Sequence, residues 1–372
     1  MTRILLLLTL IAALLLGWQF WPDERPTSTS YAGLGEDTAD FRQARPGTTL
    51  AFPADHGPHP DYRIEWWYLT ANLVDEDGRA FGVQWTLFRQ AMAPADPALE
   101  TPSPWTSRQL WMAHAALSTL GDHRFSERFA RGGVGQAGVE AAPFAAWIDD
   151  WSLRATDATA GLDRLVVQAS DETFGYRLNL DAEGPLVRHG DAGFSQKSAD
   201  GQGSMYYSQP FYRVTGQLRL DGEVIAVGGR AWLDREWSSQ LLGPTQSGWD
   251  WFSLHLDGGA KLMAFRLRGG SDEKGDGGDY LSGSWITPQG EVTPLVGDEL
   301  RLTPLDDSRV AGRELPTTWR VEVPGHGLDV TVRARHPDQW MDTSFAYWEG
   351  MVSVEGSQEG VGYLEMTGYA PE

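Results

Sequence analysis

The sequence contains no cysteine among its 372 residues, and this absence excludes several chemistries. A disulfide framework, a thiolate nucleophile, a cysteine-based zinc site and acylation at cysteine are all ruled out. Positive charge is also scarce, because 30 Lys and Arg stand against 51 Asp and Glu and leave a net charge of −21. Nucleic-acid binding is therefore not expected, since phosphates require a basic face, and docking on anionic lipid headgroups is disfavoured.

Common catalytic motifs are missing as well. The sequence does not contain Gly-x-Ser-x-Gly, the motif that forms the nucleophile elbow of many serine hydrolases. The glycine-rich run at residues 131–135 lacks the Lys-Ser/Thr ending of a phosphate-binding loop. His56, His59 and Asp61 lie close together in a proline-rich stretch, but no complete set of metal ligands surrounds them. We therefore expect neither a metal ion nor a cofactor.

Aromatic residues and glycine are abundant instead. The chain has 17 Trp, 11 Tyr, 14 Phe and 43 Gly, and 41% of its residues are hydrophobic. Glycine together with aromatic and β-branched residues favours strands and tight turns over helix bundles. The length exceeds one ordinary core and suits two domains once the N-terminus is set aside. The sequence predicts an all-β protein.

The N-terminus is typical of an export signal. Arg3 precedes an apolar run at residues 4–16, and Trp18, Phe20 and Trp21 follow where a small-residue cleavage site would be needed. We interpret residues 1–22 as a signal peptide or a membrane anchor, with an anchor spanning residues 4–21 favoured. Residues 23–47 are rich in Pro, Ser, Thr and Gly and predict a linker. The body is then expected in the periplasm or cell envelope.

From residue 50 onward, short strand-like runs alternate with turn residues. Residues 63–74 and 80–89 predict a hairpin, because the turn between them ends in Gly78, which tolerates a positive φ. Comparable hairpins are predicted for residues 212–220 with 224–233 and for residues 249–256 with 261–268. Helical periodicity is weak, and the best candidate for a helix is residues 142–149.

Three segments recur in the same order along the chain. Residues 65–68 (EWWY) resemble 249–252 (WDWF), residues 216–222 (GQLRLDG) resemble 350–356 (GMVSVEG), and residues 229–234 (GRAWLD) resemble 360–365 (GVGYLE). Two copies of short strands that begin and end alike imply a duplicated antiparallel barrel. The boundary is predicted near residues 237–248, between domains at residues 48–238 and 239–372.

Several motifs resemble one family of exported β proteins. They are Glu65-Trp66-Trp67-Tyr68, Phe88-Arg89, residues 113–118 (AHAALS), Tyr206-Tyr207-Ser208, residues 232–240 (WLDREWSSQ), Ser284-Trp285-Ile286, Tyr347-Trp348-Glu349-Gly350 and residues 362–369 (GYLEMTGY). This pattern resembles the lipocalin-like AttH/CrtC family, which includes carotenoid 1,2-hydratase (hydroxyneurosporene synthase) and relatives described as predicted secreted hydrolases. The resemblance covers roughly residues 50–370. It implies two tandem lipocalin- or calycin-like barrels packed side by side, with an apolar ligand pocket at or near their junction.

For the hydratase branch, the resemblance implies acid chemistry at Trp232-Leu233-Asp234. The His-x-Trp element that accompanies it in the family is replaced here by Met205-Tyr206-Tyr207. Asp234 and Glu236 are two residues apart, so in a strand their carboxylates share one face. Such a pair can raise one pKa and leave a protonated acid at neutral pH. The alternative is an ion pair with Arg235, Arg230 or another cation.

Glu65 and His114 are further catalytic candidates. Glu65 lies beside Trp66 and Trp67, and a carboxyl buried by aromatic rings would have a raised pKa, as a proton donor requires. The alternative is an exposed glutamate that flanks an aromatic core. His114 lies in a run of small apolar residues. It is expected to act as a general base or proton relay, or else to be a core histidine whose ring nitrogens are hydrogen-bonded.

Aromatic side chains are the candidates for contact with an apolar ligand. Those predicted to line the pocket, or else to fill the cores, are Trp67, Tyr207, Trp232, Trp237, Trp249, Trp251 and Trp348. The first functional hypothesis is a binding protein for a lipid- or isoprenoid-like small molecule. The second is a hydratase, isomerase or secreted hydrolase with Asp234 or Glu236 as the proton donor. A third is a structural partner of an envelope transporter or another membrane protein.

Overall fold

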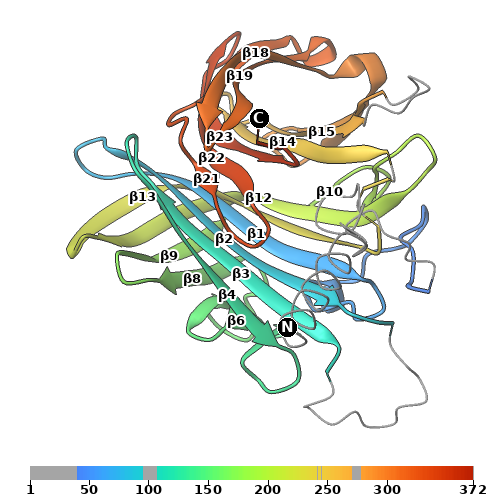
Figure 1. The fold of residues 1–372 in the computed structure, drawn as a ribbon, viewed down its shortest axis with the longest axis vertical. Helices are drawn as coiled ribbons and strands as arrows, with labels where there is room; N and C mark the ends of the chain where they lie inside the picture. Colours follow the sequence, from blue (N-terminus) through green and yellow to red (C-terminus); the bar gives the residue numbers. More distant parts are fainter. Residues whose placement is uncertain (1–39, 95–106, 241, 244, 270–277, 372) are drawn as a thin grey trace, which may run out of the picture.

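The computed structural model describes residues 40–94, 107–240, 242–243, 245–269 and 278–371. Two antiparallel sheets account for almost all of the regular structure (Figure 1). The first sheet contains β1 (Ile64–Val74), β2 (Ala80–Ala91), β3 (Gln109–Ser118), β4 (His123–Arg131), β5 (Ala137–Ala141), β6 (Phe144–Ile148), β7 (Trp151–Ala155), β8 (Arg164–Ser170), β9 (Phe174–Ala182), β10 (Val187–Arg188), β11 (Phe194–Gln196), β12 (Gly203–Leu220) and β13 (Glu223–Ser238).

The second sheet follows in the sequence and is smaller. It contains β14 (Gln246–Leu256), β15 (Lys261–Gly269), β16 (Tyr280–Ile286), β17 (Val292–Val296), β18 (Arg301–Val310), β19 (Arg313–Val323), β20 (Leu328–Ala334), β21 (Trp340–Met341), β22 (Tyr347–Gly356) and β23 (Gly360–Thr367). Within the described residues, helix is limited to the short 3-10 segments η2 (Ala54–His56), η4 (Gly297–Glu299) and η5 (Pro324–His326).

The two sheets share the order of their central strands. In the first sheet β1 lies between β2 and β13, and β13 is followed by β12. In the second sheet β14 lies between β15 and β23, and β23 is followed by β22. The repeated sequence segments fall on these corresponding strands. Each sheet is curled or nearly closed. The predicted all-β fold of two tandem barrel-like sheets is confirmed, as a barrel and a half-barrel.

The three predicted hairpins are present as β1–β2, β12–β13 and β14–β15. The predicted helix at residues 142–149 is wrong, because this segment forms β6, which pairs with β5 on one side and β7 on the other. Phe144, Ala146 and Ile148 are all buried at a spacing of two residues. Pairing on both edges satisfies the backbone there, and this outweighs the helical preference of the alanines.

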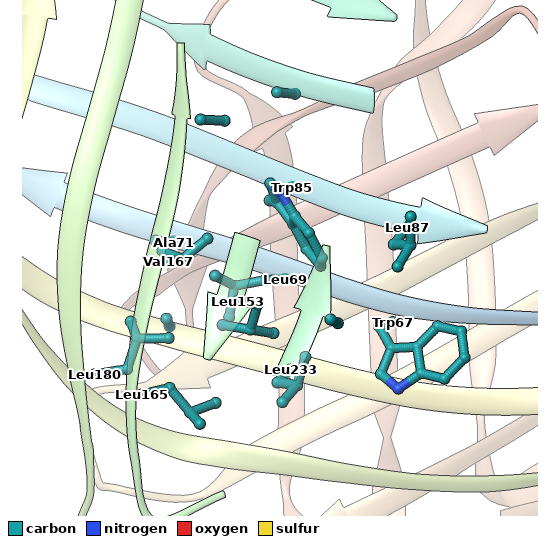
Figure 2. Close-up of a cluster of buried hydrophobic side chains, with 14 of the residues drawn as sticks. Trp67, Leu69, Ala71, Trp85, Leu87, Leu153, Leu165, Val167, Leu180 and Leu233 are labelled. Carbon is teal, nitrogen blue, oxygen red and sulfur yellow. The ribbon is translucent and has the colours of Figure 1, made fainter. Parts of the chain in front are cut away.

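Each sheet encloses its own hydrophobic core, as expected for a strand that directs alternate side chains to opposite faces. In the first core, Trp67, Trp85, Leu153 and Leu233 come from four different strands and belong to one buried cluster (Figure 2). A third buried cluster lies between the sheets, where β23 packs on β1 and β22 packs on β2. Its largest members are Tyr68, Tyr206, Trp232, Trp251, Phe265 and Tyr363.

The predicted division into domains at residues 48–238 and 239–372 stays a prediction, although the first sheet ends at Ser238 and the second begins at Gln246. The predicted signal or anchor at residues 1–22 lies outside the described residues, as does most of the predicted linker at residues 23–47. In the part of the chain that is described, no helix is long and apolar enough to cross a membrane.

Candidate functional site

A cavity of about 400 Å³ lies between the outer faces of the two sheets. The first sheet contributes residues of β1–β4, β12 and β13 to its walls, and the second contributes residues of β14, β15, β22 and β23. Most of the lining is apolar, and the members that define it are Trp66, Tyr68, Phe88, Met112, Phe129, Trp249, Trp251, Phe265, Leu267 and Phe345. Its volume lies within the range of about 300–1,000 Å³ that is usual for small-molecule sites.

Asp234 is a carboxyl of the first sheet on this cavity, and it is 2% exposed. It reaches the cavity because Leu233 and Arg235, its neighbours on β13, point to the opposite side of the strand. Tyr206 Oη donates to Asp234 Oδ2 at 2.7 Å, and Trp232 Nε1 donates to Oδ1 at 2.6 Å. Burial raises the pKa of Asp234 to about 7, although these donors and Ser208 oppose that rise. Asp234 is therefore able to donate a proton near neutral pH.

Glu236 shares the face of Asp234, as the two-residue spacing predicted, but its environment differs. Lys197 Nζ lies 2.9 Å from Glu236 Oε1, and the Ser204 hydroxyl donates to the same oxygen. Lys197 is itself buried, with its Nζ 4.1 Å from the centre of the Phe265 ring. The cation is Lys197, and not Arg235 or Arg230, the two arginines that the sequence suggested. Glu236 thus lies in a buried ion pair, whereas Asp234 has only neutral donors.

The second sheet brings two more carboxyls to the same region. Trp249 Nε1 donates to Glu365 Oε1 at 2.6 Å, and Glu365 lines the cavity. Burial raises the pKa of Glu365 to about 7; the Trp249 donor opposes this rise, and the charges of Asp234 and Glu236 add to it. Burial and the nearby Glu365 also raise the pKa of Glu349, which accepts a hydrogen bond from Tyr68 Oη at 2.5 Å.

Neither of these carboxyls was among the predicted site residues. A signal for Glu365 was present in the repeat, because the matched segments 229–234 and 360–365 place it at the position of Asp234. That pairing predicts an acid on each sheet. It does not show that the two sheets would pack so that both acids face one cavity, which only the tertiary structure decides.

Glu65 departs from the expected role of a raised-pKa acid. It is fully buried at the edge of the cavity, but its carboxylate forms ion pairs with Arg89 and Arg235 and accepts a hydrogen bond from the His59 backbone at 2.9 Å. Burial alone would raise the pKa of Glu65, but Arg235 and Arg89 lower it well below its ordinary range. The expectation of a raised pKa is therefore wrong, because the two guanidiniums outweigh the desolvation.

His114 is buried, and it contacts the cavity through a neighbour. Its Nδ1 lies 2.9 Å from the hydroxyl of Tyr347, which lines the cavity, and its Nε2 lies 3.0 Å from Glu127 Oε1. Burial lowers the pKa of His114, and the nearby Glu127 carboxylate partly opposes this. The imidazole is therefore neutral at physiological pH and holds Tyr347 in place.

The seven predicted ligand-binding aromatics separate into groups according to strand alternation. Trp249 and Trp251 line the cavity, and Trp232 supports Asp234 from within the cluster between the sheets. The others point elsewhere: Trp67, Tyr207 and Trp237 lie in the core of the first sheet, and Trp348 lies in the core of the second. They fill the two cores.

His56 and His59 contact aromatic side chains in the core of the first sheet. His56 Nδ1 lies 2.7 Å from Tyr207 Oη, and the His59 ring stacks on Trp237 with 3.9 Å between centroids. Across the described residues, no group of three or more His, Cys, Asp or Glu is arranged to hold a metal ion.

Comparison of the sequence and the fold with known proteins identifies relatives of this chain. The model of the AttH-like family matches residues 43–369. The chain belongs to the AttH-like family. No curated protein matches the sequence. An AttH protein from Nitrosomonas europaea is 33% identical to this AttH-like chain, with a TM-score of 0.77 over 89% of this chain and 100% of that one.

Two further solved structures share the AttH-like fold at low sequence identity. Kievitone hydratase from Nectria haematococca is 16% identical, with a TM-score of 0.61 over 89% of this chain and 98% of its own. CghA in complex with Sch210972 is 12% identical, with a TM-score of 0.55 over 87% of this chain and 94% of its own. At these identities the likeness concerns the fold alone.

Proposed function

We propose that this AttH-like protein binds an apolar small molecule in the cavity between its sheets and adds water to a carbon–carbon double bond of that molecule. The observation that carries the proposal is Asp234, a carboxyl with a pKa of about 7 in an otherwise mostly apolar cavity. A general acid works best when its pKa lies near the operating pH. Kievitone hydratase, which shares the fold, is named for a hydration.

The cavity suits the intermediate of such a reaction. Proton transfer from Asp234 to the less substituted alkene carbon forms a C–H bond and leaves a tertiary cation on its neighbour. Trp249, Trp251 and Phe265 line the cavity, and the faces of aromatic rings stabilise cations by electrostatic attraction. Water then adds to the cation and loses a proton, which yields a tertiary alcohol. Return of a proton from the cation without water addition would isomerise the alkene instead.

A direct test uses farnesol, a C15 isoprenoid alcohol with trisubstituted double bonds, in water enriched in ¹⁸O. The wild-type protein is expected to form an ¹⁸O-labelled tertiary alcohol, read by mass spectrometry. Asp234→Asn keeps the size of the side chain and removes its acid, so product formation should fall by about 10²- to 10⁴-fold. Quenching of tryptophan fluorescence by farnesol should persist in this variant, since the cavity is intact.

Carriage without chemistry is the second candidate, and the predominance of apolar residues in the lining favours it. Geraniol, farnesol and geranylgeraniol would then each quench tryptophan fluorescence and be recovered unchanged from deuterated buffer, in wild type and Asp234→Asn alike. That outcome would overturn the hydratase proposal and leave the binding function in place.

We also propose that the protein is exported, on the basis of Arg3 and the apolar run at residues 4–16. Mass measurement of the mature N-terminus distinguishes an anchor from a cleaved signal. An N-terminus beyond Pro22 would contradict the anchor.

A further inference from the structure

The two sheets each present a carboxyl to the same cavity from matching places in the repeat. Asp234 ends the segment 229–234 on β13, and Glu365 ends the matching segment 360–365 on β23. Both side chains line the cavity. A molecule in the cavity can therefore meet Asp234 from the first sheet and Glu365 from the second.

Two hydrogen bonds lead from Asp234 across the interface to the strand that pairs with the strand of Glu365. Tyr206 Oη donates to Asp234 and accepts from Trp251 Nε1 at 3.1 Å. Trp251 is the direct cross-strand partner of Glu365 in the β14–β23 pair. Side chains at such positions lie on the same face with their Cβ atoms about 4.5–5.5 Å apart. The two acids therefore lie near one another in the mostly apolar cavity.

Glu365 differs from the other carboxyls at the interface. Glu236 is held by Lys197, and Glu349 is fully buried against Tyr68. Among the described residues, Glu365 has no cation within ion-pair distance, and it is partly exposed at the cavity. A single indole N–H at 2.6 Å holds one of its oxygens. The other oxygen is the group that is suited to contact a water molecule in the cavity.

We infer that Glu365 is a second catalytic residue, the base that takes a proton from the attacking water. The inference rests on the proposed hydration and adds the source of the nucleophile. Asp234 gives its proton to the alkene from the first sheet. Water attacks the cation from the side of the second sheet, its oxygen lone pair forms the C–O bond, and one of its protons passes to the Glu365 carboxylate.

Protons balance over one turnover. The substrate gains one H from Asp234 and one OH from water, and the remaining proton of that water resides on Glu365. Release of this proton to solvent and uptake of one proton by Asp234 restore the starting state. Repulsion favours a single negative charge on such a pair, since the charge of an ionised Asp234 raises the pKa of Glu365. One acid and one base is therefore the favoured state near neutral pH, in keeping with a pKa of about 7 for both groups.

The test separates protonation of the alkene from addition of water. Farnesol is incubated with the protein in D₂O, and mass spectrometry follows both the tertiary alcohol and deuterium in the recovered farnesol. In Glu365→Gln, alcohol formation should fall at least about 100-fold. Deuterium exchange should stay within about threefold of wild type, because Asp234 still protonates the alkene reversibly. Asp234→Asn should lose both signals, and the exposed-acid control Glu299→Gln should change neither.

Azide provides a second measurement that does not depend on one variant. Glu365→Ser removes the base, and azide needs no base to attack a cation. Added sodium azide should therefore restore turnover in Glu365→Ser, with the tertiary alkyl azide as product, and should not do so in Asp234→Asn. Circular dichroism and quenching by farnesol confirm that each variant is folded and binds the probe.

Different results overturn different parts of the scheme. A folded Glu365→Gln that hydrates within threefold of wild type, or that loses exchange and hydration equally, would refute the role of Glu365 and leave Asp234 as the donor. Wild-type protein that produces neither alcohol nor exchange would refute the proposed hydration, and the role of Glu365 with it.

Discussion

Asp234, Glu236 and Glu65 are buried carboxyls close together on paired strands, yet their partners give them different properties. Asp234 meets neutral donors and keeps a pKa of about 7. Glu236 meets Lys197 at 2.9 Å, and Glu65 meets two guanidiniums. Burial raises the pKa of Asp234, whereas the adjacent guanidiniums lower the pKa of Glu65, so the presence or absence of cations decides which of these two can donate a proton.

The pH dependence of kcat/KM should follow the protonation of Asp234. Because the donor must be protonated, kcat/KM should fall above an apparent pKa of about 7. Tyr206→Phe removes a hydrogen bond to the carboxylate, so the pKa of Asp234 should rise and the alkaline limb should move up by roughly one pH unit. Tyr212→Phe is the matched control, since this buried hydroxyl donates to the Leu162 carbonyl instead. An unshifted limb in Tyr206→Phe would exclude Asp234 as the titrating group.

Glu65 should matter for stability more than for proton transfer. Glu65→Gln leaves Arg235 and Arg89, both almost fully buried, without their counterion. Loss of one partner of a buried pair costs about 3–5 kcal/mol in the free energy of unfolding. Glu183→Gln, which breaks the exposed pair with Arg213, should cost less than about 1 kcal/mol. Denaturant titration measures both, and equal losses would contradict the assignment of Glu65 as a structural anion.

At the scale of the strand, alternation decides which aromatics contact the cavity. Trp66 and Tyr68 of β1 face the second sheet, whereas Trp67, between them, faces the first core. A one-residue change in the register of β1 would exchange these roles. The EWWY motif therefore provides aromatic side chains to two separate environments.

Two glycines of the repeated segments allow neighbouring strands to approach closely. A Cβ on Gly229 would collide with the Asn72 carbonyl oxygen of β1, and one on Gly360 would collide with the His255 carbonyl oxygen of β14. Gly229→Ala and Gly360→Ala should each destabilise the protein by about 1–3 kcal/mol, because the colliding atoms are backbone. Gly228→Ala is the matched control, since its nearest atom would lie at 3.6 Å. Denaturant midpoints test this, and a tolerated Gly229→Ala would contradict the close approach.

At the scale of the molecule, packing of the two sheets buries acids that would be solvated in the unfolded chain. The pKa values of Asp234 and Glu365 rise to about 7 in the folded protein, against about 4 when unfolded. Between these values the folded state binds more protons, so the free energy of unfolding should decrease as the pH rises from about 4 to about 7. Above the folded pKa this contribution levels off.

The double variant Asp234→Asn/Glu365→Gln should show a shallower decrease over that pH window, because it lacks both groups. Denaturant titrations at pH 5 and pH 8 measure the difference. Glu65 does not obscure the result, since its lowered pKa changes the stability only at pH values below about 4. Equal slopes for wild type and the double variant would show that these acids do not titrate as their burial requires.

Local patterns determined a large part of this protein. Alternating strands, glycine turns such as that at Gly78 and the repeated segments predicted the all-β class, the three hairpins and the corresponding strands, because these depend on neighbouring residues. The two-residue spacing placed Asp234 and Glu236 on one face of β13. The segment at residues 142–149 was mispredicted, since its strand depends on partners at both edges.

Tertiary structure alone decided the chemistry of the site. The packing of one sheet on the other created the cavity and brought Glu365 to it from more than a hundred residues beyond Asp234. It also paired Glu236 with Lys197, Glu65 with two arginines and Asp234 with neutral donors. A pKa depends on desolvation and on charges within a few ångströms. Those distances are set by the folded chain, and no spacing along the sequence contains them.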